Sequence, residues 1–292
     1  MMRQIHGGDI YRNPVQYDFS VNTNPLGMPA AVRDALHRAV EDCGHYPDMD
    51  QTELKKAVSG MLGVPEKTLV FGNGASELFM AVVRGIAPKR TVIPVPSFYG
   101  YEYAAKAAAS EIVYCEGKAE ENFCAWEKLS ALLTKETDLL FLANPNNPTG
   151  KLTDREYMRT VLAHCRERGI YVVLDECFVS FCAGECSMLE EAGHYENLIL
   201  VNAFTKSFAI PGVRLGYLVC FDEELLQRIA RQLPEWNVSV FAQAAGIACA
   251  GQGDYLRRIA RYVKEERDFL EKELRALGIT VFSGEANFLL LY

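Results

Sequence analysis

The sequence lacks several patterns that would fix its class at once. Basic side chains are spread along its 292 residues rather than clustered, and the formal net charge is −8, which argues against a nucleic-acid partner. No apolar run approaches the roughly 20 residues that a membrane helix needs. The first residues, MMRQIHGGDIY, also lack the apolar core of a signal peptide. These absences predict a cytoplasmic protein with no membrane partner.

Cysteine pairs at metal-binding spacing are missing as well. The nine cysteines include no CxxC pair. The tightest group, Cys177, Cys182 and Cys186, has no matching pair of histidines or cysteines at zinc-site spacing. We therefore expect reduced, partly buried thiols and no metal site.

The sequence does contain a regular alternation of helical and strand patterns. Short apolar or β-branched runs, such as residues 138–143 and 171–174, are separated by helical segments such as residues 155–168. Continuous apolar strands between helices predict an α/β fold of three layers, in which helices cover both faces of a mostly parallel sheet.

The chain is long for one domain, and the alternation of helical and strand patterns runs through its middle rather than its ends. We expect a large domain over residues 44–250, with residues 1–43 and 251–292 forming an N-terminal arm and a smaller α+β domain. The sequence stops inside the apolar run NFLLLY, and a strand edge with nothing after it is open to unwanted pairing. We therefore expect the small domain to continue in a segment beyond Tyr292.

One lysine stands in a largely apolar segment, residues 201–217, which reads VNAFTKSFAIPGVRLGY. Lys206 has Phe204 and Phe208 close by in the sequence. Desolvation lowers the pKa of a lysine, and a neutral amine can form a Schiff base with an aldehyde. An ordinary surface lysine in a loop between two strands is the alternative.

Three further segments follow expected strands at their carboxyl ends, where sites in such sheets form. Residues 72–77 form a glycine loop that leads into a helix. The loop either binds a single phosphate group or serves only as a structural turn. Residues 144–150, NPNNPTG, hold an extended backbone that can aim an amide side chain. Asp175 ends a buried strand, either as a helix N-cap or as the partner of a protonated nitrogen heterocycle.

These motifs, GNGASE, NPNNPTG, LDE and TKSFAIPGVRLGY, resemble in order and spacing those of the fold-type I pyridoxal-phosphate enzymes of the class I/II aminotransferase family. The resemblance implies pyridoxal 5'-phosphate as cofactor, with its Schiff base on Lys206. It also implies an ion pair between Asp175 and the pyridinium nitrogen, a hydrogen bond from Asn147 to the ring hydroxyl, and a ring stacked on Phe98. The residues implied to hold the phosphate are Gly74, Ala75, Ser76, Thr205 and Arg214.

Tyr46, in the segment HYPD, resembles a tyrosine that reaches the phosphate of the neighbouring subunit, which implies a homodimer. Two positions depart from the family pattern. Phe178 stands where many aminotransferases carry a tyrosine, so one donor to the ring hydroxyl is lost. Ala203 stands where a hydroxyl residue is usual, which leaves more of the phosphate contact to Thr205 and Arg214.

The N-terminal segments HGGDI and DFSVNTNPLG resemble those of threonine-phosphate decarboxylases of cobalamin synthesis, close relatives of histidinol-phosphate aminotransferases. The residues that this resemblance places at the substrate are His6, Gly7, Asn22 and Asn147. For His6, a disordered terminal histidine is the alternative.

The resemblance implies decarboxylation of O-phospho-L-threonine, with transamination of histidinol phosphate or a related amino acid as the alternative. The family's substrate-binding arginines would fall beyond Tyr292, so an inactive protein that binds the cofactor is the hypothesis from another class. A nicotinamide dehydrogenase is disfavoured, because Glu77 stands where the GxGxxG motif needs its last glycine.

Overall fold

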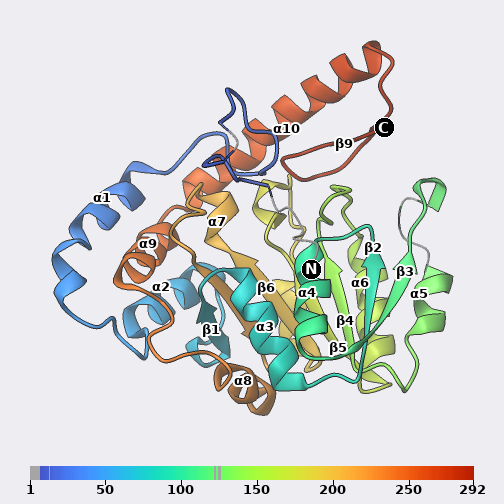
Figure 1. Cartoon of the computed structure of the whole chain (residues 1–292), viewed down its shortest axis with the longest axis horizontal. Coiled ribbons are helices and arrows are strands. Elements are labelled where there is room, and N and C mark those ends of the chain that lie inside the picture. Colours follow the sequence, from blue (N-terminus) through green and yellow to red (C-terminus); the bar gives the residue numbers. More distant parts are fainter. Residues whose placement is uncertain (1–6, 13, 122, 124–125) are drawn as a thin grey trace.

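The computed structural model describes residues 7–12, 14–121, 123 and 126–292, and a seven-stranded sheet forms its centre (Figure 1). The strands are β1 Leu69–Gly72, β2 Arg90–Val95, β3 Glu111–Glu116, β4 Leu139–Ala143, β5 Tyr171–Asp175, β6 Leu198–Ala203 and β7 Gly216–Cys220. Their order across the sheet is β1-β7-β6-β5-β4-β2-β3. Only β7 runs against the others, antiparallel to β6 and to β1. The predicted mostly parallel sheet is confirmed.

Helices cover both faces of this sheet, as the apolar strands require. Val173 packs on one face with α3 (Ala75–Ile86), α4 (Tyr99–Ala107) and α8 (Glu223–Ala230). Its neighbours Val172 and Leu174 pack on the other face. The helices on that second face are α5 Trp126–Leu132 and α6 Arg155–Arg166, with α2 Thr52–Leu62 and α9 Val240–Ala250 farther along it. The predicted three-layer α/β architecture is therefore present.

The expected strand and helix boundaries differ from the observed ones by one or two residues. Strand β5 extends one residue past the apolar run 171–174 and ends at Asp175, as expected for that carboxylate, because Asp175 pairs with Val201 in β6. Helix α6 ends at Arg166 rather than 168, and Gly169 then turns the chain with a φ of 71°. Short 3-10 helices lie at Glu41–Gly44, Glu66–Thr68, Ala119–Glu121, Val179–Phe181 and Leu189–His194.

The long helix α10, Gly253–Ala276, lies across the upper end of the sheet, next to the N-terminal segment (Figure 1). The two short strands β8 (Val281–Phe282) and β9 (Leu290–Leu291) form a separate antiparallel pair after it. The remaining helices are α1 Ala30–Arg38 and the single turn α7 Phe204–Ser207. The domain boundaries at 44 and 250 stay a prediction. None of the described helices has the length and apolar character needed to cross a bilayer.

Candidate active site

A cavity of about 780 Å³ lies where β4, β5 and β6 end, and Ala143, Asp175 and Ala203 all line it. Small-molecule and cofactor pockets commonly measure about 300–1,000 Å³. The predicted site residues that line this cavity are Gly7, Asn22, Ala75, Ser76, Phe98, Asn147, Asp175, Thr205, Lys206 and Arg214. Segments that are far apart in the sequence therefore meet at one edge of the sheet, as the strand-end rule predicts.

The N-terminus of α3 and the Arg214 side chain form a cradle suited to an anion. Gly74 precedes the helix with a φ of 81°, and a Cβ added there would lie 2.4 Å from Nη2 of Arg214. Gly74 thus lies against the guanidinium rather than on the cavity wall. Gly216 in β7 is equally restricted, because its Cβ would lie 2.8 Å from the backbone nitrogen of Ala75. Helix N–H groups and a guanidinium at one point fit a phosphate group.

Lys206 lies on α7, and its side chain lines the cavity with that of Thr205. Burial lowers the pKa of the Lys206 amine, and the positive charge of Arg214 lowers it further, against the opposing effects of Cys177 and Asp175. Nζ lies 6.0 Å from the centre of the Phe178 ring. The desolvation expected from the apolar sequence around Lys206 is therefore present, and it favours the neutral amine.

Asp175 is a buried carboxylate with a hydrogen bond to each oxygen. The Tyr101 hydroxyl donates to Oδ2 at 2.6 Å, and the backbone N–H of Cys177 donates to Oδ1 at 2.9 Å. Burial raises the pKa of Asp175, while these two donors lower it. Asp175 does not cap a helix, because the next helix in the chain, the 3-10 helix Val179–Phe181, has Phe178 as its N-cap. No described basic residue forms an ion pair with Asp175, so the site suits a cationic ring nitrogen.

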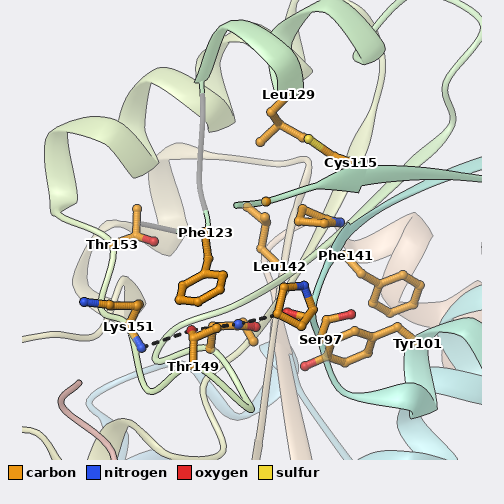
Figure 2. Close-up of a pocket in the computed structure, with 15 residues that line it drawn as sticks. Ser97, Tyr101, Cys115, Phe123, Leu129, Phe141, Leu142, Thr149, Lys151 and Thr153 are labelled. Carbon is orange, nitrogen blue, oxygen red and sulfur yellow. Dashed lines mark hydrogen bonds between the residues drawn. The ribbon is translucent and has the colours of Figure 1, made fainter. Parts of the chain in front are cut away.

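Tyr101 is the residue at this site that the sequence reasoning missed. Its side chain is 1% exposed. Its ring is stacked on Phe141 with centroids 5.0 Å apart, and it meets Phe98 edge-on at 5.6 Å. Figure 2 shows Tyr101 beside Ser97 and Phe141 at a second cavity of about 60 Å³, and Tyr101 lines both cavities. The one available signal was that Tyr101 follows Phe98 by three residues, which places it in the first turn of α4, directly after the N-cap Phe98.

Asn147 lines the cavity from a loop that its neighbours hold in place. The side-chain amide of Asn146 donates to the Pro96 carbonyl at 3.1 Å and to the Thr149 hydroxyl at 2.9 Å. The backbone N–H of Glu285 also donates to the Gly150 carbonyl at 2.7 Å. Among the described residues none forms a hydrogen bond with the side chain of Asn147, which leaves its amide able to serve a ligand.

The predicted N-terminal residues have different outcomes. Gly7 and Asn22 line the cavity, and a Cβ added at Gly7 would lie 2.0 Å from the Ser20 carbonyl oxygen. His6 lies outside the described residues. Tyr46 is 80% exposed and does not line this cavity; its ring lies 4.9 Å from that of Trp236. The role of Tyr46 toward a neighbouring subunit stays a prediction.

The family model for aminotransferase classes I and II matches residues 14–292. The chain belongs to this family. It is 32% identical over 300 residues to the threonine-phosphate decarboxylase of Salmonella typhimurium. The matched region covers 100% of this chain and 82% of that protein.

Solved structures agree with this assignment. The histidinol-phosphate aminotransferase of Clostridium acetobutylicum superimposes with a TM-score of 0.86 at 31% identity, over 93% of this chain and 81% of that one. A second structure is that of the histidinol-phosphate aminotransferase of Sinorhizobium meliloti, solved in complex with pyridoxal 5'-phosphate. It superimposes with a TM-score of 0.84 at 23% identity, over 93% of this chain and 74% of that one. The fold is that of the pyridoxal-phosphate-dependent aminotransferases.

The two departures from the usual pattern of class I and II aminotransferases both face the cavity. Phe178 and Ala203 line it, and neither side chain offers a hydrogen bond. Phe178 packs edge-on against Phe288, with ring centroids 5.1 Å apart. The apolar wall beside Lys206 is thereby extended, in keeping with the lowered pKa of that amine.

Replacing Tyr101 with Phe should lower turnover by about tenfold without unfolding the protein. The variant keeps the ring contacts with Phe98 and Phe141 but removes the hydrogen bond to Oδ2 of Asp175, and a hydrogen bond to a charged group contributes about 1.5–3 kcal/mol. The pKa of Asp175 should rise, because a donor to its ionised form is lost. Steady-state kinetics against pH test this expectation. A Tyr103→Phe variant, changed at a tyrosine that is 62% exposed, is the control.

Glu176, the last residue of the LDE motif, serves the structure rather than the cavity. Its buried carboxylate accepts hydrogen bonds from the Ser187 hydroxyl at 2.5 Å and from the Met188 N–H at 2.8 Å. Burial raises its pKa from 4.5 to about 7. Between these values the folded protein keeps a proton that the unfolded chain has lost, so this group's contribution to stability falls as the pH rises from 4.5 to 7.

The free energy of unfolding of a Glu176→Gln variant, compared with that of the wild type, should therefore be higher at pH 8 than at pH 5. Between the two pH values, the stability of the variant relative to the wild type should change by up to about 3 kcal/mol, since one pKa unit corresponds to about 1.4 kcal/mol. Glutamine has the same shape, accepts from Met188 and can donate to Ser187. Urea denaturation of both proteins at the two pH values measures the difference. A stability gap that does not change with pH would contradict the raised pKa.

Proposed function

We propose that the protein binds pyridoxal 5'-phosphate in the large cavity and decarboxylates O-phospho-L-threonine to aminopropanol phosphate. One observation carries the proposal: a desolvated amine, an anion cradle and a buried carboxylate that pairs with no described basic residue all face the same cavity. When bound, the cofactor supplies an electron-withdrawing ring that accepts the electron pair of a bond broken at the substrate α-carbon.

The residues of the chain divide the work of holding this group. Lys206, whose burial favours the neutral amine, would bind the aldehyde carbon. Asp175, oriented by Tyr101, would keep the ring nitrogen protonated. Asn147 would donate to the ring hydroxyl, and Phe98 would cover one ring face. The residues that would bind the phosphate are Gly74, Ala75, Ser76, Thr205 and Arg214.

The choice between decarboxylation and transamination depends on which substrate bond stands perpendicular to the ring, because that bond overlaps with the ring's π system. Gly7, Asn22 and Asn147 line the cavity, and they would orient the substrate. His6, which lies outside the described residues, would join them. The relative from Salmonella typhimurium, named for threonine-phosphate decarboxylation, supports loss of CO2. The likeness to a histidinol-phosphate aminotransferase at 31% identity favours amino transfer as the second candidate.

The test is incubation of the purified protein with the cofactor and O-phospho-L-threonine while CO2 is measured. Stoichiometric CO2 and aminopropanol phosphate would support the first candidate. Amino transfer from histidinol phosphate that depends on a keto acid and releases no CO2 would establish the second. A protein that stays colourless after reconstitution would contradict both and favour an inactive, regulatory or scaffolding role.

We further propose that the protein works as a homodimer in the cytoplasm, with Tyr46 of each subunit serving the phosphate site of the other. Tyr46 and its neighbour Trp236 are 80% and 43% exposed, and an exposed aromatic pair suits a protein interface. Sedimentation equilibrium of the wild type and of a Tyr46→Ala variant tests the assembly. A monomeric wild type at micromolar concentration would contradict it.

A further inference from the structure

Asn24 is a buried asparagine that lies beside the Lys206 helix, although 183 positions separate it from Ser207 in the sequence. Its backbone N–H donates to the carbonyl of Lys206 at 3.0 Å. Its side-chain Nδ2 donates to the next carbonyl, that of Ser207, at 2.6 Å. One residue therefore binds two successive carbonyls of α7, the helix that carries Lys206.

The remaining bonds of Asn24 fix the orientation of its amide. Nδ2 also donates to the Tyr255 hydroxyl at 2.7 Å, and Oδ1 accepts from the Leu26 N–H at 2.8 Å. The Tyr255 hydroxyl donates in turn to the Gly27 carbonyl. Only an amide provides two donors on one side and an acceptor on the other, so aspartate cannot replace asparagine here. Tyr255 belongs to α10, which links this network to the helix above the sheet.

Helix α7 needs such external support because it contains only four residues. Isolated helices shorter than about 12 residues are marginal in water, since few internal hydrogen bonds offset the ordering of the chain. Within the local turn, the Lys206 carbonyl accepts only a long bond of 3.3 Å from the Ala209 N–H. Ala209 then leaves the helix with a φ of 52°. The place of Lys206 is thus set by contacts with remote parts of the chain.

We infer that Asn24 is a positioning residue for Lys206, which fixes the backbone of α7 so that the amine keeps one place in the cavity. Through Tyr255 it also ties that backbone to α10. The inference rests on the proposed role of Lys206 as the amine that binds the cofactor. It assigns a role to a residue of the NTNPLG segment that the substrate site itself does not use.

The test compares Asn24→Ala with a matched variant, Asn197→Ala. Asn197 is 5% exposed, and its amide donates to the carbonyls of Leu162 and Ile170 at 3.3 and 3.1 Å, near the amino ends of the strands. Both substitutions remove a buried amide that donates two hydrogen bonds, so both should lower stability. Asn197→Ala should cost no more than Asn24→Ala, because Oδ1 of Asn197 has no partner among the described residues. Only Asn24→Ala should speed amide hydrogen exchange over residues 207–210, by about tenfold, in the protein without cofactor.

Two further measurements separate positioning from stability alone. In the protein loaded with cofactor, Asn24→Ala should shift the pH dependence of the visible absorbance and lower kcat with little change in KM. The control variant should leave both unchanged. Should Asn24→Ala fail to fold, Tyr255→Phe, which removes one partner of the Asn24 amide, takes its place in the same comparison.

The inference is supported if exchange over residues 207–210 is faster in the Asn24 or Tyr255 variant and not in the Asn197→Ala control. Exchange and absorbance equal to those of the Asn197 control overturn it. The exchange measurement needs no cofactor, so it decides the role of Asn24 separately from the proposed function. A wild type that binds no cofactor would contradict the proposed function, while the exchange result would still stand.

Discussion

The Lys206→Ala variant is expected to lose turnover by at least about a thousandfold, a loss on the scale of removing a positioned catalytic group. It should also lose the visible absorbance of the reconstituted protein. Lys206 is the single lysine among the described residues that line the cavity, and burial favours its neutral form. Because no other described amine lies there, no neighbour can take over its bond to the aldehyde.

The control for this prediction is Lys206→Arg. A guanidinium keeps the positive charge but stays protonated at any working pH, so it cannot act as a nucleophilic amine. This variant should be as inactive as Lys206→Ala, which would separate the chemistry of the amine from the effect of its charge. Thermal unfolding should show that both variants are folded. Turnover retained in either variant would refute the assignment of the site.

The second large effect is expected for Asp175→Asn, which should lower turnover by about a hundredfold or more. An amide has the same shape but cannot balance a positive ring nitrogen, and breaking a buried charge pair costs about 3–5 kcal/mol. The affinity for the cofactor should fall as well, which equilibrium dialysis of the reconstituted protein measures. Asp175→Glu keeps the charge and displaces it, so an intermediate loss is expected.

The pH dependence gives a second measure of the same group. Burial raises the pKa of Asp175, so the wild type should lose cofactor affinity as acid protonates the carboxyl group. The Asn variant should lack this loss. Without cofactor it should be at least as stable as the wild type at pH 8, because a buried carboxylate without an ion-pair partner disfavours folding. A clear loss of stability there would instead indicate a structural role.

Much of the fold was predictable because it depends on residues that are close in sequence. Apolar runs such as residues 171–174 identify buried strands, and helical spacing identifies the segments that cover them. The direction of β7 was not predictable in this way. Residues 204–215 separate it from β6, which is about the minimum length for a parallel crossover, so the length alone allows either direction. In the structure only four of these residues form a helix, α7, and the strand returns antiparallel.

The sequence by itself determined where the candidate site residues gather: Asp175 ends a strand, Lys206, Asn147 and the glycine loop come at or after the ends of others, and strand ends meet at one edge of a parallel sheet. The tertiary structure alone decided what holds those groups in place. The hydrogen bond from Tyr101 to Asp175 spans 74 positions, and the one from Asn24 to Ser207 spans 183. Periodicity and turn chemistry act over a few residues, so contacts made between remote segments appear only once the chain is folded.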